Sequence, residues 1–253
     1  MSFYSNSNSN VEARPYGVDL SAIMRQVYMW VALGLLVSFG VAYVVGNTAM
    51  AALANAPITR TGQLPNFILF NPIVMIGSII LYFIVAFTLQ PVIMRTSPAV
   101  GGLMYLFFTA LFGFMMSTIF LSYRQETIAL AFVSTAATFG AMSVVGYTTK
   151  IDLSKMGSLL LMALIGLIIA TIVNIFVNSS LLFMLINYVG VLIFVGLTAY
   201  DTQWIKNTAA NVASSGDPTA AARVGLIGAF HLFLDFVNLF LFILRILGGG
   251  RRR

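Results

Sequence analysis

Long uncharged apolar runs recur along this chain of 253 residues, and they constrain its fold more than any other feature. An α-helix needs about 20 such residues to cross the hydrocarbon core of a bilayer. Only 8% of the residues are charged and 60% are hydrophobic, whereas soluble domains carry roughly a quarter charged residues. The sequence therefore excludes a water-soluble enzyme and predicts an integral membrane protein.

The same runs exclude a transmembrane β-barrel, whose strands of roughly ten residues alternate between apolar and polar side chains. Here the runs are apolar on all sides, so we expect an all-α membrane protein. Cysteine is absent and histidine occurs once, which excludes a disulfide framework, a thiolate nucleophile and a zinc site built from Cys and His. The 13 basic residues are scattered, so we expect them to flank membrane spans and not to bind nucleic acid.

The pattern predicts seven transmembrane helices in one membrane domain, residues 25–248. Their approximate ranges are 27–46, 67–94, 99–123, 127–149, 156–177, 181–205 and 222–247. Residues 1–24 form a polar tail without the charged start, short apolar core and cleavage site of a signal peptide. Residues 249–253 form a basic tail.

Basic residues are distributed unequally between the two sides of this bundle. One side holds Arg14, Arg25, Arg95, Lys150, Lys155, Lys206 and Arg223, and the other side holds Arg60 and Arg124. Because cytoplasmic segments are enriched in Lys and Arg, a cytoplasmic N-terminus is predicted. The absence of a signal peptide and of cysteine agrees with a multi-pass protein of a bacterial inner membrane.

The basic residues near the end of the chain oppose this orientation, because seven crossings place Arg245 and residues 251–253 outside. A last helix that enters the membrane and returns would remove the conflict. We favour a seventh crossing, since the apolar run 224–244 is long enough to span.

Of the Asp, Glu, Lys, Arg and His residues, three lie clearly within the predicted spans, away from their ends: Asp201 in 181–205, and His231 and Asp235 in 222–247. An ionisable group costs about 3 kcal/mol at the centre of a membrane helix, so each one requires a reason. On the last helix the polar residues share one stripe, because their separations fit the helical period. That stripe holds His231, Asp235, Asn238 and Arg245, continued by Gly225 and Gly228, with Phe233, Phe236 and Phe240 elsewhere. We expect the stripe to face protein or a wet cavity and this helix to be the buried central one.

The preceding helix has a comparable face that includes Thr198 and Asp201. Asp201, Asp235 and Arg95 belong to the same side of the bundle and could converge. Depth is the difficulty, because Asp235 lies about 18 Å along a straight helix from Arg223, deeper than Asp201. The two aspartates meet only if the last helix begins at a shallow depth in the membrane or the preceding helix tilts.

If the aspartates meet, they cannot both ionise cheaply in a low dielectric, so they share one proton. The pair then acts as a pH-dependent latch, closed when protonated. When deprotonated it offers oxygen ligands to a hard cation such as Ca2+, although too few for a complete shell. By pairing with an ionised carboxylate, Arg95 would determine whether the protonated or the deprotonated state of the pair is favoured.

Purely structural roles are the alternative. Asp201 could cap a helix or pair with Lys206, and Asp235 could hydrogen-bond an Asn or Tyr. His231 is expected to be a hydrogen-bond partner and not a metal ligand, because the chain has no second His or Cys.

Two segments carry a family resemblance. Gly196-Leu-Thr-Ala-Tyr-Asp-Thr-Gln-Trp-Ile-Lys206 resembles the penultimate-helix motif of the Bax inhibitor family, and 234–248 looks like its final-helix motif. The match in span number and order covers about residues 20–248, and residues 94–101 resemble the family segment after the second helix.

The resemblance implies two three-helix layers around a central last helix and a pH-sensitive Ca2+ leak. It implies that Asp201 and Asp235 form a hydrogen-bonded latch that binds Ca2+ transiently, and that Arg95 can engage Asp201. Ca2+ would be the transported ion, and no cofactor is expected. His231 and the tail 248–253 lie outside the family pattern.

Three functions are therefore compared. The first is a pH-gated calcium leak, with the bilayer, Ca2+ and protons as partners. The second is a non-catalytic regulator of other membrane proteins. The third is an intramembrane aspartyl protease, but such enzymes resemble Gly-x-Gly-Asp at the second aspartate, whereas this chain has Leu232-Phe-Leu-Asp235. We therefore expect no enzyme.

Overall fold

The computed structural model describes residues 19–54 and 71–249, and those residues form helices and short connections without a strand. The helices are α1 Leu20–Ala54, α2 Pro72–Arg95, α3 Pro98–Met116, α4 Ile119–Ser122, α5 Gln125–Thr148, α6 Ser154–Val177, α7 Ser180–Ser215 and α8 Pro218–Gly249. With α3 and α4 counted as one segment, Pro98–Ser122, seven of these are long and apolar enough to cross a membrane. The predicted all-α, seven-span fold class is confirmed.

The ends of the predicted spans differ from the observed ones before α7 as well, since α1 ends at Ala54 and not at 46, and α2 begins at Pro72 and not at 67. Helix α1 begins at Leu20, inside the residues assigned to the polar tail, and Asp19 caps it by accepting a hydrogen bond from the backbone N–H of Ser21. The predicted span 99–123 is interrupted between α3 and α4, where Ser117 and Thr118 donate their hydroxyls to carbonyls three residues earlier. The parts of the two predicted tails at 1–18 and 250–253, including Arg14, lie outside the described residues, as does Arg60.

Helix α7 is much longer than predicted, because it continues from the expected end at 205 to Ser215. The segment 206–215 is polar, which suggested a loop, but it contains no Gly or Pro and several good helix formers. The helix ends at Gly216, which adopts a left-handed conformation with φ of 67°. Asp217 then caps α8 by accepting a hydrogen bond of 2.8 Å from the backbone N–H of Thr219.

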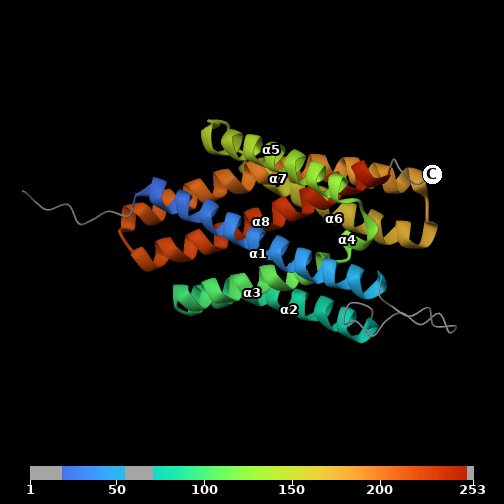
Figure 1. The fold of residues 1–253 in the computed structure, drawn as a ribbon. Coiled ribbons are helices and arrows are strands. Elements are labelled where there is room, and N and C mark those ends of the chain that lie inside the picture. Colours follow the sequence, from blue (N-terminus) through green and yellow to red (C-terminus); the bar gives the residue numbers. More distant parts are fainter. Residues whose placement is uncertain (1–18, 55–70, 250–253) are drawn as a thin grey trace, which may run out of the picture.

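Helix α8 is the central helix of the bundle, as predicted. Of its apolar span 67% is buried, against 33% or less for the other spans. It packs against α7, α1, α5 and α3 and runs between α1 and α7 in Figure 1. Helices α1 and α2 pack on α3, and α5 and α6 pack on α7. The expected two three-helix layers are compatible with this packing.

Phe233 and Phe236 of α8 point away from its polar stripe. Phe233 makes edge-to-face contacts with Tyr105, Phe108 and Phe112 of α3, and Phe236 packs in the same way on Phe139 of α5. These aromatic contacts fix the rotation of α8 about its axis. Its polar stripe is thereby turned toward α6 and α7.

Candidate functional site

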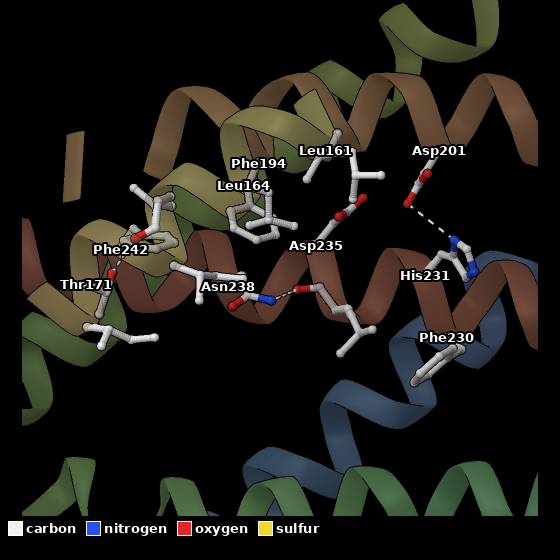
Figure 2. A pocket seen from close by; sticks show the side chains of 15 residues that line it. Leu161, Leu164, Thr171, Phe194, Asp201, Phe230, His231, Asp235, Asn238 and Phe242 are labelled. Carbon is white, nitrogen blue, oxygen red and sulfur yellow. Dashed lines mark hydrogen bonds and ion pairs between the residues drawn. The ribbon is translucent and has the colours of Figure 1, made fainter. Parts of the chain in front are cut away.

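A cavity of about 590 Å³ lies between α6, α7 and α8, and most of its wall is apolar. Four polar residues of α7 and α8 line it: Asp201, His231, Asp235 and Asn238 (Figure 2). The prediction that the polar stripe of the last helix faces a cavity is confirmed for three of its residues. Arg245 is not among the lining residues; its guanidinium lies 5.6 Å from the centre of the Phe242 ring.

The length of α7 removes the difficulty of depth. Asp201 lies 14 residues before Ser215, the last residue of α7, and Asp235 lies 17 residues after Pro218, the first residue of α8. At 1.5 Å per residue, both carboxylates are then about 20 to 25 Å from the tight turn that joins the helices. The two helices are antiparallel, so both aspartates reach the same cavity.

The residue level with Asp201 is His231, which lies 13 residues after Pro218. Nδ1 of His231 is 3.5 Å from Oδ2 of Asp201, and their side chains are 30% and 15% exposed (Figure 2). The His231 ring stacks on Trp204, with ring centres 5.2 Å apart and an angle of 11° between the planes. Trp204 follows Asp201 by three residues and therefore shares its face of α7.

Asp235 lies one turn deeper than His231 and is only 4% exposed. Its Oδ2 atom is buried and has no hydrogen-bond partner among the described residues. Asp201 is close enough for its charge to act on the Asp235 carboxyl, and the two side chains project into the same space (Figure 2). Two carboxylates in such a site cannot both ionise without a large electrostatic cost.

The structure does not give the two aspartates the partners that purely structural roles would require. Lys206 donates a hydrogen bond of 2.7 Å to the carbonyl of Tyr147 and lies 5.0 Å from the centre of that ring, so it does not serve as the partner of Asp201. Asn238 donates to the carbonyl of Leu234 at 2.8 Å, one turn back on its own helix. No Asn or Tyr in the described part of the chain therefore satisfies the free oxygen of Asp235.

Two of the predicted site residues do not line the cavity that holds the aspartates. Thr198 is fully buried and donates to the carbonyl of Phe194 at 2.7 Å, and it is not among the residues that line the cavity. Arg95 is exposed at the end of α2 and does not line the cavity either. The structure thus does not bring Arg95 to Asp201, and its part in gating stays a prediction.

The arginine that connects α8 to the end of α2 is Arg223, which sequence reasoning did not single out. Its Nη2 donates a hydrogen bond of 3.0 Å to the carbonyl of Thr96, the residue after Arg95. The sequence feature that could have pointed to Arg223 was its place on the same predicted side of the membrane as Arg95. Whether Arg95 or Arg223 makes the contact between α2 and α8 depends on side-chain packing that hydropathy does not describe.

A stable metal site requires more ligands than the two aspartates supply. In residues 19–54 and 71–249 no group of three or more His, Asp or Glu side chains gathers to hold an ion. Transient binding of Ca2+ by Asp201 and Asp235 stays a prediction.

Comparisons with known proteins give consistent matches over nearly the whole chain. The family model described as "Inhibitor of apoptosis-promoting Bax1" matches residues 20–252. The inner membrane protein YbhL of Escherichia coli K12 is 38% identical over 251 residues, which cover 99% of this chain and 100% of that protein. An uncharacterized protein of Deinococcus radiodurans is 39% identical, with 92% of each chain covered. One of Caulobacter vibrioides is 38% identical, with 92% of this chain and 90% of that protein covered.

Proposed function

Because the chain belongs to the Bax inhibitor family and is a multi-pass protein of the bacterial inner membrane type, we propose that it is a pH-sensitive cation leak with Ca2+ as the transported ion. In this proposal Asp201 and Asp235 form the gate, between α7 and α8. The N-terminus is cytoplasmic, which places the joined ends of α7 and α8 on the cytoplasmic side.

The observation that carries the proposal is the buried, unpartnered carboxylate oxygen of Asp235 beside a second carboxylate. A buried polar group without a hydrogen bond costs about 1–3 kcal/mol of stability. The aromatic contacts of α8 with α3 and α5 do not involve Asp235, so they do not offset that cost. Ionisable residues kept inside a membrane at such a cost mark ion or proton pathways.

The gate responds to pH through the charge of the pair. At low pH one proton is shared between the carboxylates, and the pair holds α7 against α8. At higher pH both carboxylates are charged and repel each other, and their oxygens attract a hard divalent cation. Influx should therefore increase as the pH rises.

Opening of the gate requires α7 and α8 to separate, and these two helices are in close contact near the cavity. A Cβ atom on Gly228 of α8 would lie 3.0 Å from Cγ2 of Ile205 of α7, so the absence of a side chain at Gly228 lets α8 pack closely on the Ile205 side chain. Gly228 lies one turn before His231 on α8. Repulsion within the cavity thus acts beside a close contact of the α7–α8 interface.

The experiment is Ca2+ influx into liposomes that contain the full chain and a trapped Ca2+ dye, from about pH 6 to about pH 8. Wild type is compared with Asp201→Asn and Asp235→Asn. Asp152→Asn is the matched control, because Asp152 is exposed and lies between α5 and α6. Hydrogen bonds from the hydroxyl and the backbone N–H of Ser154 hold the pKa of Asp152 below its ordinary value, so this carboxylate stays ionised throughout the interval.

We expect wild type and Asp152→Asn to share one rising influx curve, and each gate variant to lose its dependence on pH. Influx that is equal at both ends of the interval in wild type contradicts the proposal. Folded protein that gives no influx above empty liposomes also contradicts it and favours a regulator of other membrane proteins, whose activity would survive Asn at both gate positions.

A further inference from the structure

We propose that His231 is a third member of the gate, a positioning residue whose charge holds Asp201 and assigns the proton of the pair to Asp235. The inference rests on the proposed function, because it concerns which group controls the same gate. It goes beyond the family pattern, which includes the two aspartates and Arg95 but not His231.

The register of the helices carries the inference. Across the α7–α8 interface the group opposite Asp201 is His231, with 3.5 Å between Nδ1 and Oδ2 (Figure 2). Asp235 lies one turn deeper, and its Oδ2 has no hydrogen-bond partner in the described part of the chain. Asp201 therefore has a cationic partner when the imidazole is protonated, and Asp235 has none.

The other groups around His231 do not compete for this role. The α6 residues that line the cavity are apolar apart from Thr171. Helix α1 meets α8 through Gln26, which is near Gly225, while α3 and α5 meet its opposite faces through aromatic rings. The charged side chains on neighbouring segments are occupied or distant, as described above for Lys206, Arg223 and Arg95. The titratable groups that face His231 are thus Asp201 and Asp235.

Trp204 supports the charged imidazole. The nearly parallel stack, with ring centres 5.2 Å apart, restrains the ring in the orientation that directs Nδ1 toward Asp201. The electron-rich face of an indole also attracts a cation that lies over it. Trp204 and Asp201 therefore form one receptor on α7 for a protonated His231.

The charge states follow from this arrangement. With His231 protonated, Asp201 is ionised beside it, and the proton that the carboxylates share resides on the deeper Asp235. Histidine is the side chain that ordinarily changes charge between about pH 5 and 8. Loss of its proton removes the positive charge from between α7 and α8 and leaves Asp201 unbalanced. Opening of the gate then requires loss of the charged contact between His231 and Asp201 as well as loss of the proton that the carboxylates share.

The pairing is tested without any measurement of flux, because His231 is the only histidine of the chain. Full-length protein with ¹⁵N-labelled histidine in lipid nanodiscs gives one pair of imidazole signals. At about pH 6.5, near the ordinary value for histidine, we expect a larger neutral fraction in Asp201→Asn than in wild type, since the carboxylate favours the protonated ring. Asp152→Asn is the control and should match wild type. An unchanged neutral fraction in folded Asp201→Asn overturns the proposal.

The gating role is tested by two substitutions with opposite charge effects. His231→Lys keeps a positive charge from about pH 6 to about pH 8 and should hold liposome influx at the wild-type low-pH level. His231→Gln has no charge at any pH and should increase influx at about pH 6 toward the wild-type level at about pH 8. A merely structural role would change both variants in the same direction, and that result, or two curves that coincide with wild type, overturns the inference.

The outcomes separate this inference from the proposed function. Influx that depends on pH in wild type and is unaffected by either His231 substitution leaves the leak in place and removes His231 from its gate. Absence of influx in wild type removes the leak, and the inference with it as a statement about gating, while the neutral fraction still decides whether Asp201 and His231 form a pair.

Discussion

Replacing Asp235 with leucine should make the protein more stable and remove its response to pH. Asp235 is 4% exposed, and one of its carboxylate oxygens is buried without a partner in the described part of the chain. Its side chain projects into a cavity whose wall includes Leu161 and Leu164, so a leucine has room and apolar neighbours. Removing an unsatisfied buried group recovers about 1–3 kcal/mol of the free energy of unfolding.

The measurement is thermal unfolding of wild type and Asp235→Leu in the same detergent, followed by the fluorescence of tryptophan. A chain of this size gains about 2–4 °C in Tm per kcal/mol, so we expect Tm to rise by about 2–12 °C. The gain should be larger at about pH 8 than at about pH 6, because the repulsion that the substitution removes increases as both carboxylates ionise. Leu239→Ala is the control for core damage; Leu239 is fully buried on α8, and its truncation should cost about 2–5 kcal/mol.

The reasoning is refuted if Asp235→Leu lowers Tm as Leu239→Ala does, because the carboxylate would then contribute to the fold. It is refuted equally if Tm does not change, since no energetic cost would then be attached to Asp235. A rise in Tm together with influx that no longer depends on pH is the expected trade between stability and activity.

Two further predictions concern the packing and the connections of α7. A Cβ atom on Gly146 of α5 would collide with the backbone of Ala199, so Gly146→Ala should lower the free energy of unfolding by about 1–3 kcal/mol. Gly140→Ala on the same helix meets no atom within 4 Å and should stabilise by up to about 1 kcal/mol; equal effects on Tm would contradict the packing argument. Gln203 accepts a hydrogen bond of 2.8 Å from the backbone N–H of Leu153, so Gln203→Leu should cost about 1–3 kcal/mol. Hydrogen exchange at Leu153 should become faster, and an unchanged rate would show that the bond does not hold this connection.

The spans and the polar face of the last helix could be predicted from the sequence because both are local properties. A run of about 20 apolar residues must satisfy its backbone within a helix when it crosses a membrane. The helical period then places His231, Asp235 and Asn238 on one face and Phe233 and Phe236 on others. These predictions require no knowledge of neighbouring helices, and the structure confirms them.

The partners across helices could not be predicted in this way. Polar composition at 206–215 suggested a loop, whereas the absence of a helix breaker before Gly216 lets α7 continue. That extension moves the turn outward and changes which residues of α7 and α8 are level. Asp201 consequently meets His231 and shares a cavity with Asp235, while Arg95 stays at the surface.

The sequence by itself thus determined the membrane class, the seven spans and the choice of residues that carry a cost inside the membrane. Only the tertiary structure decided the register of α7 against α8, the pairing of Asp201 with His231 on Trp204, and the isolation of the Asp235 oxygen. The physical reason is that hydropathy and helical period act along one segment. Register depends on where two segments turn and on which side chains permit their backbones to approach.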